Sequence, residues 1–515
     1  MSAAAAGAAE TGKHNLARLA EEYYERVGDF DTLWFEGAWH TTGEIHDRAA
    51  RVAGGLRRIG IEPGDRVVVL MMNTPEVFVS YQAIWRAGAV VTPVIFLQTE
   101  PELHHILEDS GAKAVIVSDL LVPLAASAAQ GLDLQLIVVG DVPEGVENAI
   151  PYADLETADP APIEPRADQD LAALLYTGGT TGRAKGVMLS HHGLWESGRG
   201  VEAIARSIDA TRTLLPLPLS HAFGLIVTIA GLHTDRQIAS FMQRWFDAQN
   251  WLELVQEYKI ESSSVVPSML QMILALPYAD YDLSSLTSCG SGAAPLLPAI
   301  REEAERGLGI TLLEGYGCTE SSAVISTPPS VEENRPGSVG KPLPQHEVAI
   351  LDPLGNPVPT GEEGEICLRG DGIMLGYWND PEQTARTVVD GWLHTGDVGR
   401  FDEDGYLYIV DRVKDLIIRG GFNVFPRDVE DALLEHEAVA GAAVVGVPDE
   451  AKGEEVVAVV ALHPGHAAEP EELVEFAKAR LAKYKYPREV RIVEAVPLTS
   501  VGKTDRKAVR ALVRG

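Results

Sequence analysis

Apolar runs alternate with amphipathic segments through the first part of the chain. We expect strands at residues 66–72, 89–94 and 113–118, and helices at residues 75–87 and 101–110. Strands separated by helices of this length are typical of βαβ units, which build largely parallel sheets. A further buried strand is expected at residues 171–176, followed by a Gly- and Thr-rich loop and another strand at residues 186–189.

The pattern changes twice in the last third of the chain. Between Glu347 and Asp411, short strands and Gly/Asp turns replace the helices, which indicates a small β-barrel-like part. From Asp415 onward, the pattern is that of a compact α+β domain. The predicted fold class is therefore α/β, with a large N-terminal domain of mixed and parallel sheets (13–411) and a small α+β domain (412–515). Residues 1–12 are interpreted as a disordered leader.

Composition favours a soluble globular protein, since 46% of the residues are hydrophobic and 23% are charged. No apolar run approaches the roughly 18 residues of a membrane span, and the Ala-rich start lacks the basic region of a secretion signal. Three cysteines are too few for a disulfide framework, and we interpret them as small buried side chains. A reducing cytoplasm is the expected compartment. The oligomeric state stays open, with a homodimer among the alternatives.

The formal net charge of −33 argues against a nucleic-acid partner. This charge is unevenly distributed, because residues 412–515 contain 16 Lys and Arg against 17 Asp and Glu. The acidic excess therefore lies almost wholly in residues 1–411. The nearly neutral C-terminal part is better suited to approach an anionic ligand.

The loop that follows the strand at 171–176 has the composition of a phosphate-binding site. Three glycines allow backbone N–H groups to converge on an anion, three threonines add hydroxyl donors, and a lysine adds a positive charge. These residues are Thr177, Gly178, Gly179, Thr180, Thr181, Gly182 and Lys185. The spacing is not that of a Walker loop, because Gly186 stands where a Ser or Thr would hold magnesium. Any magnesium must then be held by a carboxylate elsewhere in the chain.

Several further motifs follow this loop in a fixed order. They are Pro216–His221, Gly290–Pro295, Gly315–Glu320, Trp392–Asp397, Asp411–Asp415, Gly420–Pro426 and Gly502–Lys503. With the loop, they resemble the acyl-adenylate-forming superfamily, which comprises acyl- and aryl-CoA ligases, non-ribosomal adenylation domains and beetle luciferases. The similarity extends over nearly the whole chain and is greatest to fatty-acid and aryl-acid CoA ligases.

The resemblance implies a role for each motif in joining ATP to a carboxylic acid. Lys503, Thr180, Lys185 and Glu320 correspond to catalytic positions, and Glu320 to the ligand of Mg²⁺. ATP would contact the loop residues named above together with Gly292, Ala293, Ala294, Gly315, Tyr316, Gly317, Thr319, Asp397 and Arg412. Tyr316 offers a flat face to adenine, although a structural role for this tyrosine competes with that interpretation. Asp397 corresponds to the acid that binds the ribose hydroxyls.

The C-terminal domain is expected to be mobile by the same resemblance. Lys414 corresponds to a hinge, which acts by changing backbone conformation and not by chemistry. In a second pose, Gly420 and Gly421 would line the channel for the pantetheine arm of coenzyme A.

The residues expected around the acyl group are small or apolar and include no Arg or Lys. They are Phe223, Val266, Ser291 and Cys318. His221 either gates this pocket, as its counterparts do in relatives, or is a hydrogen-bonded core histidine. No carboxylate lies near His221 to pair an amino group, so a hydrophobic fatty or aryl monocarboxylic acid is the expected substrate.

Four functions remain open from the sequence. The first is an acid–CoA ligase that uses ATP, Mg²⁺ and coenzyme A. The second forms the same adenylate but loads the phosphopantetheine of a carrier protein. The third is a luciferase-like oxygenase, and the fourth is a non-enzymatic nucleotide sensor. The presence of Lys185, Glu320, Asp397 and Lys503 disfavours the fourth.

Overall fold

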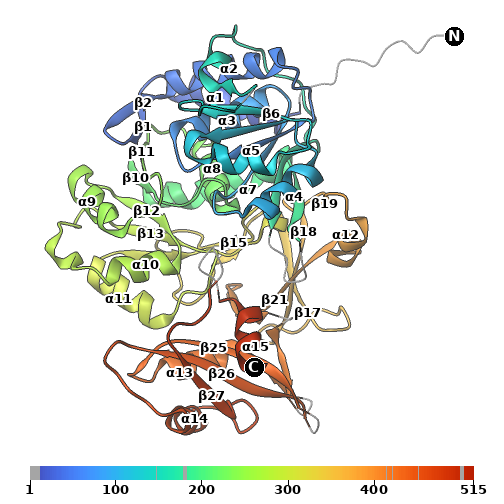
Figure 1. Ribbon diagram of the computed structural model, residues 1–515. Coiled ribbons are helices and arrows are strands. Elements are labelled where there is room, and N and C mark those ends of the chain that lie inside the picture. Colours follow the sequence, from blue (N-terminus) through green and yellow to red (C-terminus); the bar gives the residue numbers. More distant parts are fainter. Residues whose placement is uncertain are drawn as a thin grey trace. The chain divides into compact units, whose positions relative to one another are not determined.

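The computed structural model describes residues 12–146, 148–177, 183–412, 415–419, 422–449, 452–498 and 504–514. By its internal contacts the chain forms two units (Figure 1). The first unit holds residues 1–348 and 368–393, and the second holds residues 349–367 and 394–515. The predicted α/β class is confirmed.

One sheet of the first unit has the strand order β19-β9-β8-β4-β3-β5-β6-β7. Its strands are β3 (Arg66–Leu70), β4 (Val90–Pro93), β5 (Ala114–Ser118), β6 (Gln135–Val139), β7 (Ile150–Pro151), β8 (Leu171–Thr177), β9 (Lys185–Ser190) and β19 (Gly376–Tyr377). The strands from β8 to β7 run parallel, whereas β9 and β19 are antiparallel to their neighbours. The alternation of strands and helices therefore predicted the parallel part correctly.

A second sheet of this unit has the order β14-β13-β12-β10-β11-β1-β2. Its strands are β1 (Asp31–Phe35), β2 (Ala38–Thr41), β10 (Arg212–Leu215), β11 (Ala239–Met242), β12 (Ser262–Val265), β13 (Ser288–Ser291) and β14 (Thr311–Glu314). All neighbouring pairs are parallel except β1 and β2. Parallel strands end at the same sheet edge, so the loops after β13 and β14 leave the sheet side by side.

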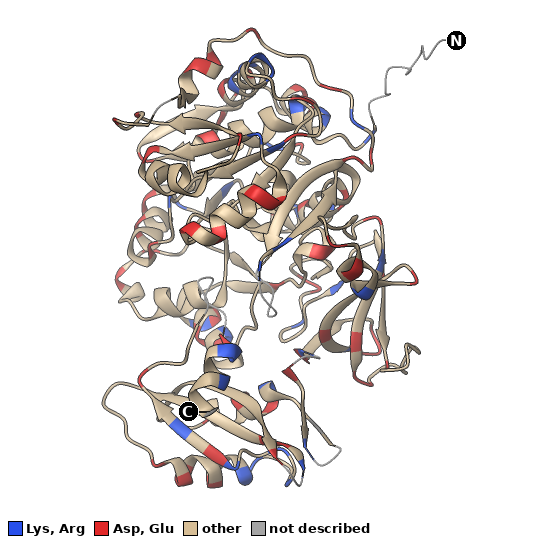
Figure 2. Ribbon diagram, turned by 45° about the vertical axis from the view of Figure 1, so that its right-hand side comes forward, with Lys and Arg blue, Asp and Glu red and all other residues tan. Residues whose placement is uncertain are grey.

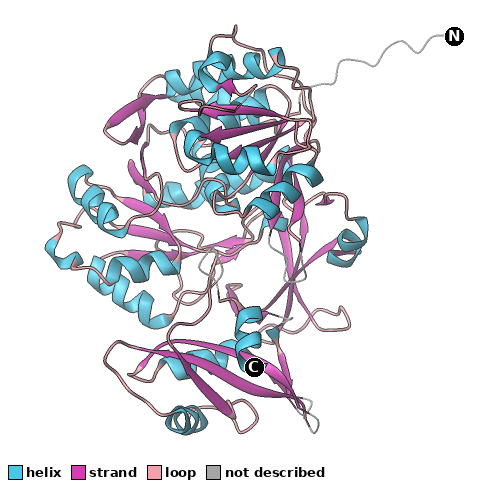
Figure 3. Cartoon of the chain, viewed as in Figure 1, coloured by secondary structure: helices cyan, strands magenta, loops and turns pink. Residues whose placement is uncertain are grey.

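Helices cover both sheets of the first unit (Figure 3). They are α1 (Leu16–Val27), α2 (Thr42–Arg58), α3 (Pro75–Arg86), α4 (Glu100–Ser110), α5 (Val122–Ala128), α6 (Tyr152–Glu156), α7 (His191–Ile208), α8 (Ala222–Gly231), α9 (Ala248–Tyr258), α10 (Pro267–Leu274), α11 (Pro298–Leu308) and α12 (Pro381–Thr387), with short 3₁₀ turns η1 (Asp119–Leu121), η2 (Tyr278–Asp280) and η3 (Thr319–Ser321).

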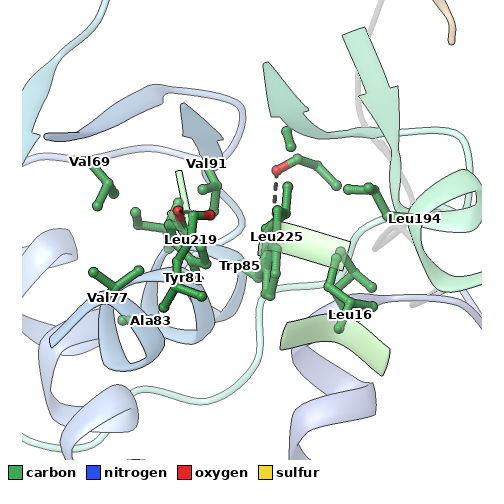
Figure 4. Packing of buried hydrophobic residues seen from close by; sticks show 14 of the residues in the cluster. Leu16, Val69, Val77, Tyr81, Ala83, Trp85, Val91, Leu194, Leu219 and Leu225 are labelled. Carbon is green, nitrogen blue, oxygen red and sulfur yellow. Dashed lines mark hydrogen bonds between the residues drawn. The ribbon is translucent and has the colours of Figure 1, made fainter. Parts of the chain in front are cut away.

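Alternation along β3 shows why the sheet needs helices on both faces. Val67 and Val69 point into a core shared with α1, α2, α3, α7 and α8, whereas Val68 and Leu70 point into a core with α4 and α5. A strand buried on both faces is apolar throughout. Figure 4 shows Val69 and Val91 with Tyr81 and Trp85 of α3 in the larger core.

The remaining strands connect these sheets to the C-terminal part of the chain. They are β15 (Ser326–Thr327), β16 (Lys341–Pro342), β17 (His346–Leu351), β18 (Gly364–Gly370), β20 (Val388–Val389), β21 (Trp392–Phe401) and β22 (Leu407–Arg412). Strands β17, β18, β21 and β20 form one sheet in this order, and β22 pairs with β21. This sheet corresponds to the predicted small β part.

The second unit contains a sheet of order β24-β23-β26-β25, with β27 beside β26. Its elements are β23 (Ile417–Arg419), β24 (Phe422–Val424), α13 (Pro426–Leu434), β25 (Val439–Asp449), β26 (Gly453–Leu462), α14 (Pro470–Lys478), β27 (Glu489–Val493) and α15 (Arg506–Arg514). Val444 and Val456 face α13 and α14, whereas Val445 and Val457 face α15. Each face of the sheet is therefore covered by helices.

Charged residues are interspersed over the chain, and every charged residue of α15 is basic (Figure 2). None of the helices in the described ranges is long and apolar enough to cross a membrane.

The unit boundary differs from the predicted boundary at Asp411–Arg412. The two predicted boundary residues lie inside the second unit, because β22 and α13 are in contact there. The Arg427 N–H donates a hydrogen bond to Asp411 Oδ2 (2.9 Å). Gly12, which the sequence assigned to the leader, donates its N–H to the Arg166 carbonyl (2.7 Å). The other leader residues, 1–11, and the predicted hinge Lys414 lie outside the described residues.

Candidate active site

The two stems of the Gly- and Thr-rich loop are antiparallel strands of the first unit. In the register of β8 and β9, Thr177 stands opposite Lys185. The loop therefore leaves and re-enters the sheet at one point, where both of these side chains are partly buried. Gly178, Gly179, Thr180, Thr181 and Gly182 lie outside the described residues.

Helix α4 fixes both stems. The Tyr176 hydroxyl donates to Asp109 Oδ2 (2.7 Å), and His105 Nε2 lies 3.0 Å from the Ala184 carbonyl oxygen. Burial, followed by the hydrogen bond to Asp109 and the charge of this carboxylate, raises the pKa of Tyr176, so the phenol stays a donor. Asp109 could not be predicted from the sequence, because the contact joins residues that are 67 positions apart.

Close packing explains why the residue after Lys185 is a glycine, Gly186. A Cβ at Gly186 would lie 3.0 Å from Leu174 Cδ1 and 3.1 Å from Trp378 Cβ. These approaches are too close for a larger side chain without rearrangement. Close packing therefore favours glycine where a Walker loop has the Ser or Thr that holds magnesium.

Tyr377 joins Lys185 to Glu320. The Tyr377 hydroxyl donates to Glu320 Oε1 (2.8 Å), and Lys185 Nζ lies 5.5 Å from the centroid of the Tyr377 ring. Only 8% of Tyr377 is exposed. Burial, followed by the charge of Glu320, raises the pKa of Tyr377, so the phenol is protonated at neutral pH. A cation and a carboxylate that are 135 positions apart in the sequence thus contact the same aromatic ring.

Two loops at one sheet edge carry the residues expected to bind adenine. Ser291 ends β13 opposite Glu314 at the end of β14. A Cβ on Gly292 would lie 3.2 Å from the Gly315 carbonyl oxygen, so the two loops are in contact. Ala293 has φ 67°, in the left-handed region that costs about 1–2 kcal/mol for a residue with a Cβ. Such strained backbone is commonly found at binding sites.

The loop after β14 is closely packed around Tyr316. The Tyr316 carbonyl accepts hydrogen bonds from the N–H groups of Ile325 (2.8 Å) and Ser326 (3.0 Å). A Cβ at Gly317 would lie 2.0 Å from the Ala323 carbonyl oxygen, so only glycine fits there. Thr319 and Glu320 follow in the 3₁₀ turn η3. This packing fixes the direction in which the chain reaches Glu320.

The residues expected around the acyl group also lie in the first unit. His221 is the N-cap of α8, and its Nδ1 accepts the Phe223 N–H (3.2 Å), so the neutral ring carries its proton on Nε2. A Cβ on Gly292 would lie 3.6 Å from Phe223 Cε1. Ser291 is buried, and its Oγ has no hydrogen-bond partner among the described residues. Val266, the N-cap of α10, and Cys318 are partly buried.

The remaining described site residues, Asp397 and Arg412, form an ion pair in the second unit. They stand opposite each other on β21 and β22, and Arg412 Nε lies 2.9 Å from Asp397 Oδ1. The Asp397 side chain is buried, whereas 49% of the Arg412 side chain is exposed. The ion pair therefore holds a buried carboxylate beside a cation that water can reach.

The turn before Asp397 is held by a residue that the sequence did not single out. Glu365 Oε1 accepts the Gly396 N–H (3.0 Å), and Glu365 Oε2 lies 2.8 Å from His394 Nδ1. Cys367 Sγ lies 3.4 Å from the same nitrogen, and burial raises the pKa of this thiol to about 12. Cys367 is therefore a packing residue, as expected. Lys503, Lys414, Gly420 and Gly421 lie outside the described residues.

Each of the two units, with the loops described above, has the fold of an acyl-adenylate-forming enzyme. A model of the AMP-binding enzyme family matches residues 20–378, and a model of the AMP-binding enzyme C-terminal domain matches residues 428–503. The chain therefore belongs to the AMP-binding enzyme family, which confirms the predicted resemblance.

Relatives of known name align over almost the full chain. A long-chain-fatty-acid–CoA ligase of Bacillus subtilis is 35% identical over 96% of this chain and 93% of its own length. A feruloyl-CoA synthase of an Amycolatopsis species is 37% identical over 91% of this chain and 93% of its own length. The structure of ATP-bound MatB from Rhodopseudomonas palustris matches with a TM-score of 0.88 at 31% identity, and the match covers 97% of this chain and 99% of MatB.

Proposed function

We propose that this chain is an ATP-dependent, AMP-forming carboxylic acid–CoA ligase that acts on a hydrophobic fatty or aryl monocarboxylic acid. In the first half-reaction, a carboxylate oxygen attacks the α-phosphorus of ATP and pyrophosphate leaves. In the second, the thiol of coenzyme A attacks the acyl carbon, loses its proton, and AMP leaves with the original carboxylate oxygen. The names of the relatives support this reaction and leave the acid open.

The contact of Lys185 and Glu320 with one tyrosine carries this proposal. A reaction between a carboxylate and a triphosphate brings anions together, so a fixed cation and a metal site are needed beside the phosphates. Lys185 begins the strand that closes the Gly- and Thr-rich loop, and Glu320 is joined to it through Tyr377. The charge of Lys185 would then act on the phosphates from one side, with Glu320 close by.

Glu320 suits magnesium. Mg²⁺ is usually bound by one or two protein carboxylates together with substrate phosphates and water. One oxygen of Glu320 accepts the Tyr377 hydroxyl, and the other accepts no hydrogen bond from any described residue. Magnesium, when bound there, would neutralise part of the phosphate charge. Asp397 would accept hydrogen bonds from the ribose hydroxyls, while Arg412 holds this carboxylate in place.

The proposed acid follows from the chemistry of the acyl site. Phe223, Val266, Ser291 and Cys318 include no cation that would pair a second carboxylate and no anion that would pair an ammonium group. Ser291 contributes one hydroxyl that lacks a described partner, which suits a single polar substituent on an otherwise apolar acid.

We further propose that residues 412–515 act as a lid with its hinge at Lys414, and that Lys503 bridges the substrate carboxylate to the nucleotide. Gly420 and Gly421 would line the pantetheine channel. These assignments rest on the resemblance of the motifs. The alternative acceptor is a carrier-protein phosphopantetheine, which uses the same first half-reaction.

A substrate panel tests the proposal. The enzyme is incubated with ATP, Mg²⁺ and one acid at a time, with and without coenzyme A; the acids are a long-chain fatty acid, ferulate, an amino acid and a dicarboxylate. We expect pyrophosphate release with the fatty acid or ferulate, and a thioester only with coenzyme A. Activity confined to the amino acid or the dicarboxylate would contradict the proposed substrate. Adenylate formation without any thioester would favour the carrier-protein alternative.

A further inference from the structure

Tyr377 lies on the short strand β19, which is paired with the strand that Lys185 begins. Strand β19 is only two residues long, and it pairs with β9 so that Tyr377 stands opposite Val187. The Leu375 N–H donates to the Met188 carbonyl (2.8 Å), and the Trp378 N–H donates to the Gly186 carbonyl (2.7 Å). The backbone on both sides of Tyr377 is therefore fixed to the strand that Lys185 begins.

The side chain of Tyr377 is fixed as well. The Tyr377 N–H donates to Thr384 Oγ1 (2.8 Å), which ties β19 to α12. The ring is buried and lies 5.5 Å from Lys185 Nζ. Its hydroxyl donates to Glu320 Oε1 at 2.8 Å. A buried ring on a backbone that is fixed to β9 and α12 has little rotational freedom, so it can hold both charged groups at a constant separation.

We propose that Tyr377 is a positioning residue that orients Glu320 toward magnesium and couples metal binding to nucleotide binding through Lys185. The inference rests on the proposed function, because it takes Glu320 as the magnesium ligand. The phenol donates to one carboxylate oxygen and so aims the other at the metal. Groups that orient metal ligands in this way typically change metal affinity by about 10- to 100-fold when they are removed.

The test is the gain in ATP affinity that Mg²⁺ produces, measured by titration calorimetry with the full chain in the absence of any acid. ATP is titrated once with EDTA and once with saturating Mg²⁺. In Tyr377→Phe we expect the gain to fall by about 10-fold or more. The affinity for metal-free ATP should stay within about 3-fold of wild type, which also shows that the variant is folded. Tyr408→Phe, which removes the 3.2 Å hydrogen bond to Asp402 Oδ2, is the matched control and should keep the full gain.

Glu320→Gln separates this inference from the proposed function. If Glu320→Gln keeps the magnesium gain, Glu320 does not hold the metal, and both its proposed role and the role of Tyr377 fail, whereas the ligase reaction itself is tested by the substrate panel. If Glu320→Gln loses the gain and Tyr377→Phe retains it, only the role of Tyr377 is overturned. In the double variant, the loss should be no larger than in Glu320→Gln alone, because the tyrosine acts through the carboxylate. Fully additive losses would contradict that mechanism.

Discussion

Glu320 in the first unit and Asp397 in the second are both carboxylates with a proposed binding role, but their partners differ in charge. Glu320 accepts a hydrogen bond from a neutral phenol, whereas Asp397 is paired with the guanidinium of Arg412. A neutral donor orients a carboxylate and leaves its charge available to a cation. An arginine neutralises the carboxylate and leaves a pair that suits uncharged hydroxyls. The two partners therefore fit the roles proposed above, a metal ligand in one unit and a ribose ligand in the other.

The first half-reaction also needs a cation beside the substrate carboxylate. We assign this role to Lys503. Lys503→Ala should lower the rate of adenylate formation by about 1,000-fold, because it removes a charge that acts mainly in the transition state. Thioester formation from a supplied acyl-adenylate should stay within about 3-fold of wild type. The two half-reactions are measured separately by pyrophosphate release and by thioester formation. An equal loss in both would refute this division of roles.

Asp411 is a third kind of carboxylate, because among the described residues its oxygens accept hydrogen bonds from backbone N–H groups, those of Arg412 (2.7 Å) and Arg427 (2.9 Å). Burial raises the pKa of Asp411 to about 6, against the hydrogen bonds and the charge of Arg506. The pKa of Asp411 in the folded protein lies above its value in the unfolded chain, so the protonated carboxyl stabilises the fold. This stabilisation is fully present below about pH 4 and is lost as the pH rises through 6.

Asp411→Asn should remove this pH dependence. The free energy of local unfolding around α13 should be higher in the variant than in wild type at pH 7, by up to about 3 kcal/mol more than the difference at pH 4. Hydrogen exchange of peptides that cover α13, compared between the two proteins at each pH, measures this difference. A difference that is the same at pH 4 and pH 7 would contradict the burial argument.

Asp397→Asn tests the contrast with Glu320 most closely. We expect ATP affinity to fall by roughly 30-fold, or about 2 kcal/mol, because hydrogen bonds to a charged group are lost. The gain produced by Mg²⁺ should persist, unlike in Glu320→Gln. Calorimetric titration of ATP with and without Mg²⁺ measures both quantities. Loss of the magnesium gain in Asp397→Asn would show that the two carboxylates do not differ as their partners indicate.

The sequence predicted the elements of the fold well where a strand is buried on both faces. Val67–Leu70 is apolar throughout, and the structure places β3 between two cores. The antiparallel edge formed by β9 and β19 was not predicted, because β19 is too short to show a period and its partner is far away in the sequence. The contact of β22 with α13 was likewise not predicted, because local composition does not reveal which elements pack together.

The sequence predicted the motifs of the candidate site. It did not predict the residues elsewhere in the chain that hold these motifs in place. Lys185, Glu320 and Asp397 lie in segments whose residue types and order identify the family. Tyr377, Asp109 and Glu365 act by contacts over sequence distances of 57, 67 and 29 residues. Such contacts depend on the folded register of strands and leave no local pattern. Sequence motifs therefore predicted the groups that are proposed to bind the ligand, and the structure identified the residues that hold these groups in place.

The central claim is that the acid is activated as an acyl-adenylate, and transfer of an oxygen isotope tests it most directly. The enzyme is given a fatty acid or ferulate labelled with ¹⁸O in its carboxylate, together with ATP, Mg²⁺ and coenzyme A, and the nucleotide product is analysed by mass spectrometry. Attack of the carboxylate on the α-phosphorus predicts AMP that carries one ¹⁸O atom for each thioester formed. Formation of ADP and labelled inorganic phosphate, or of unlabelled AMP, would contradict the account.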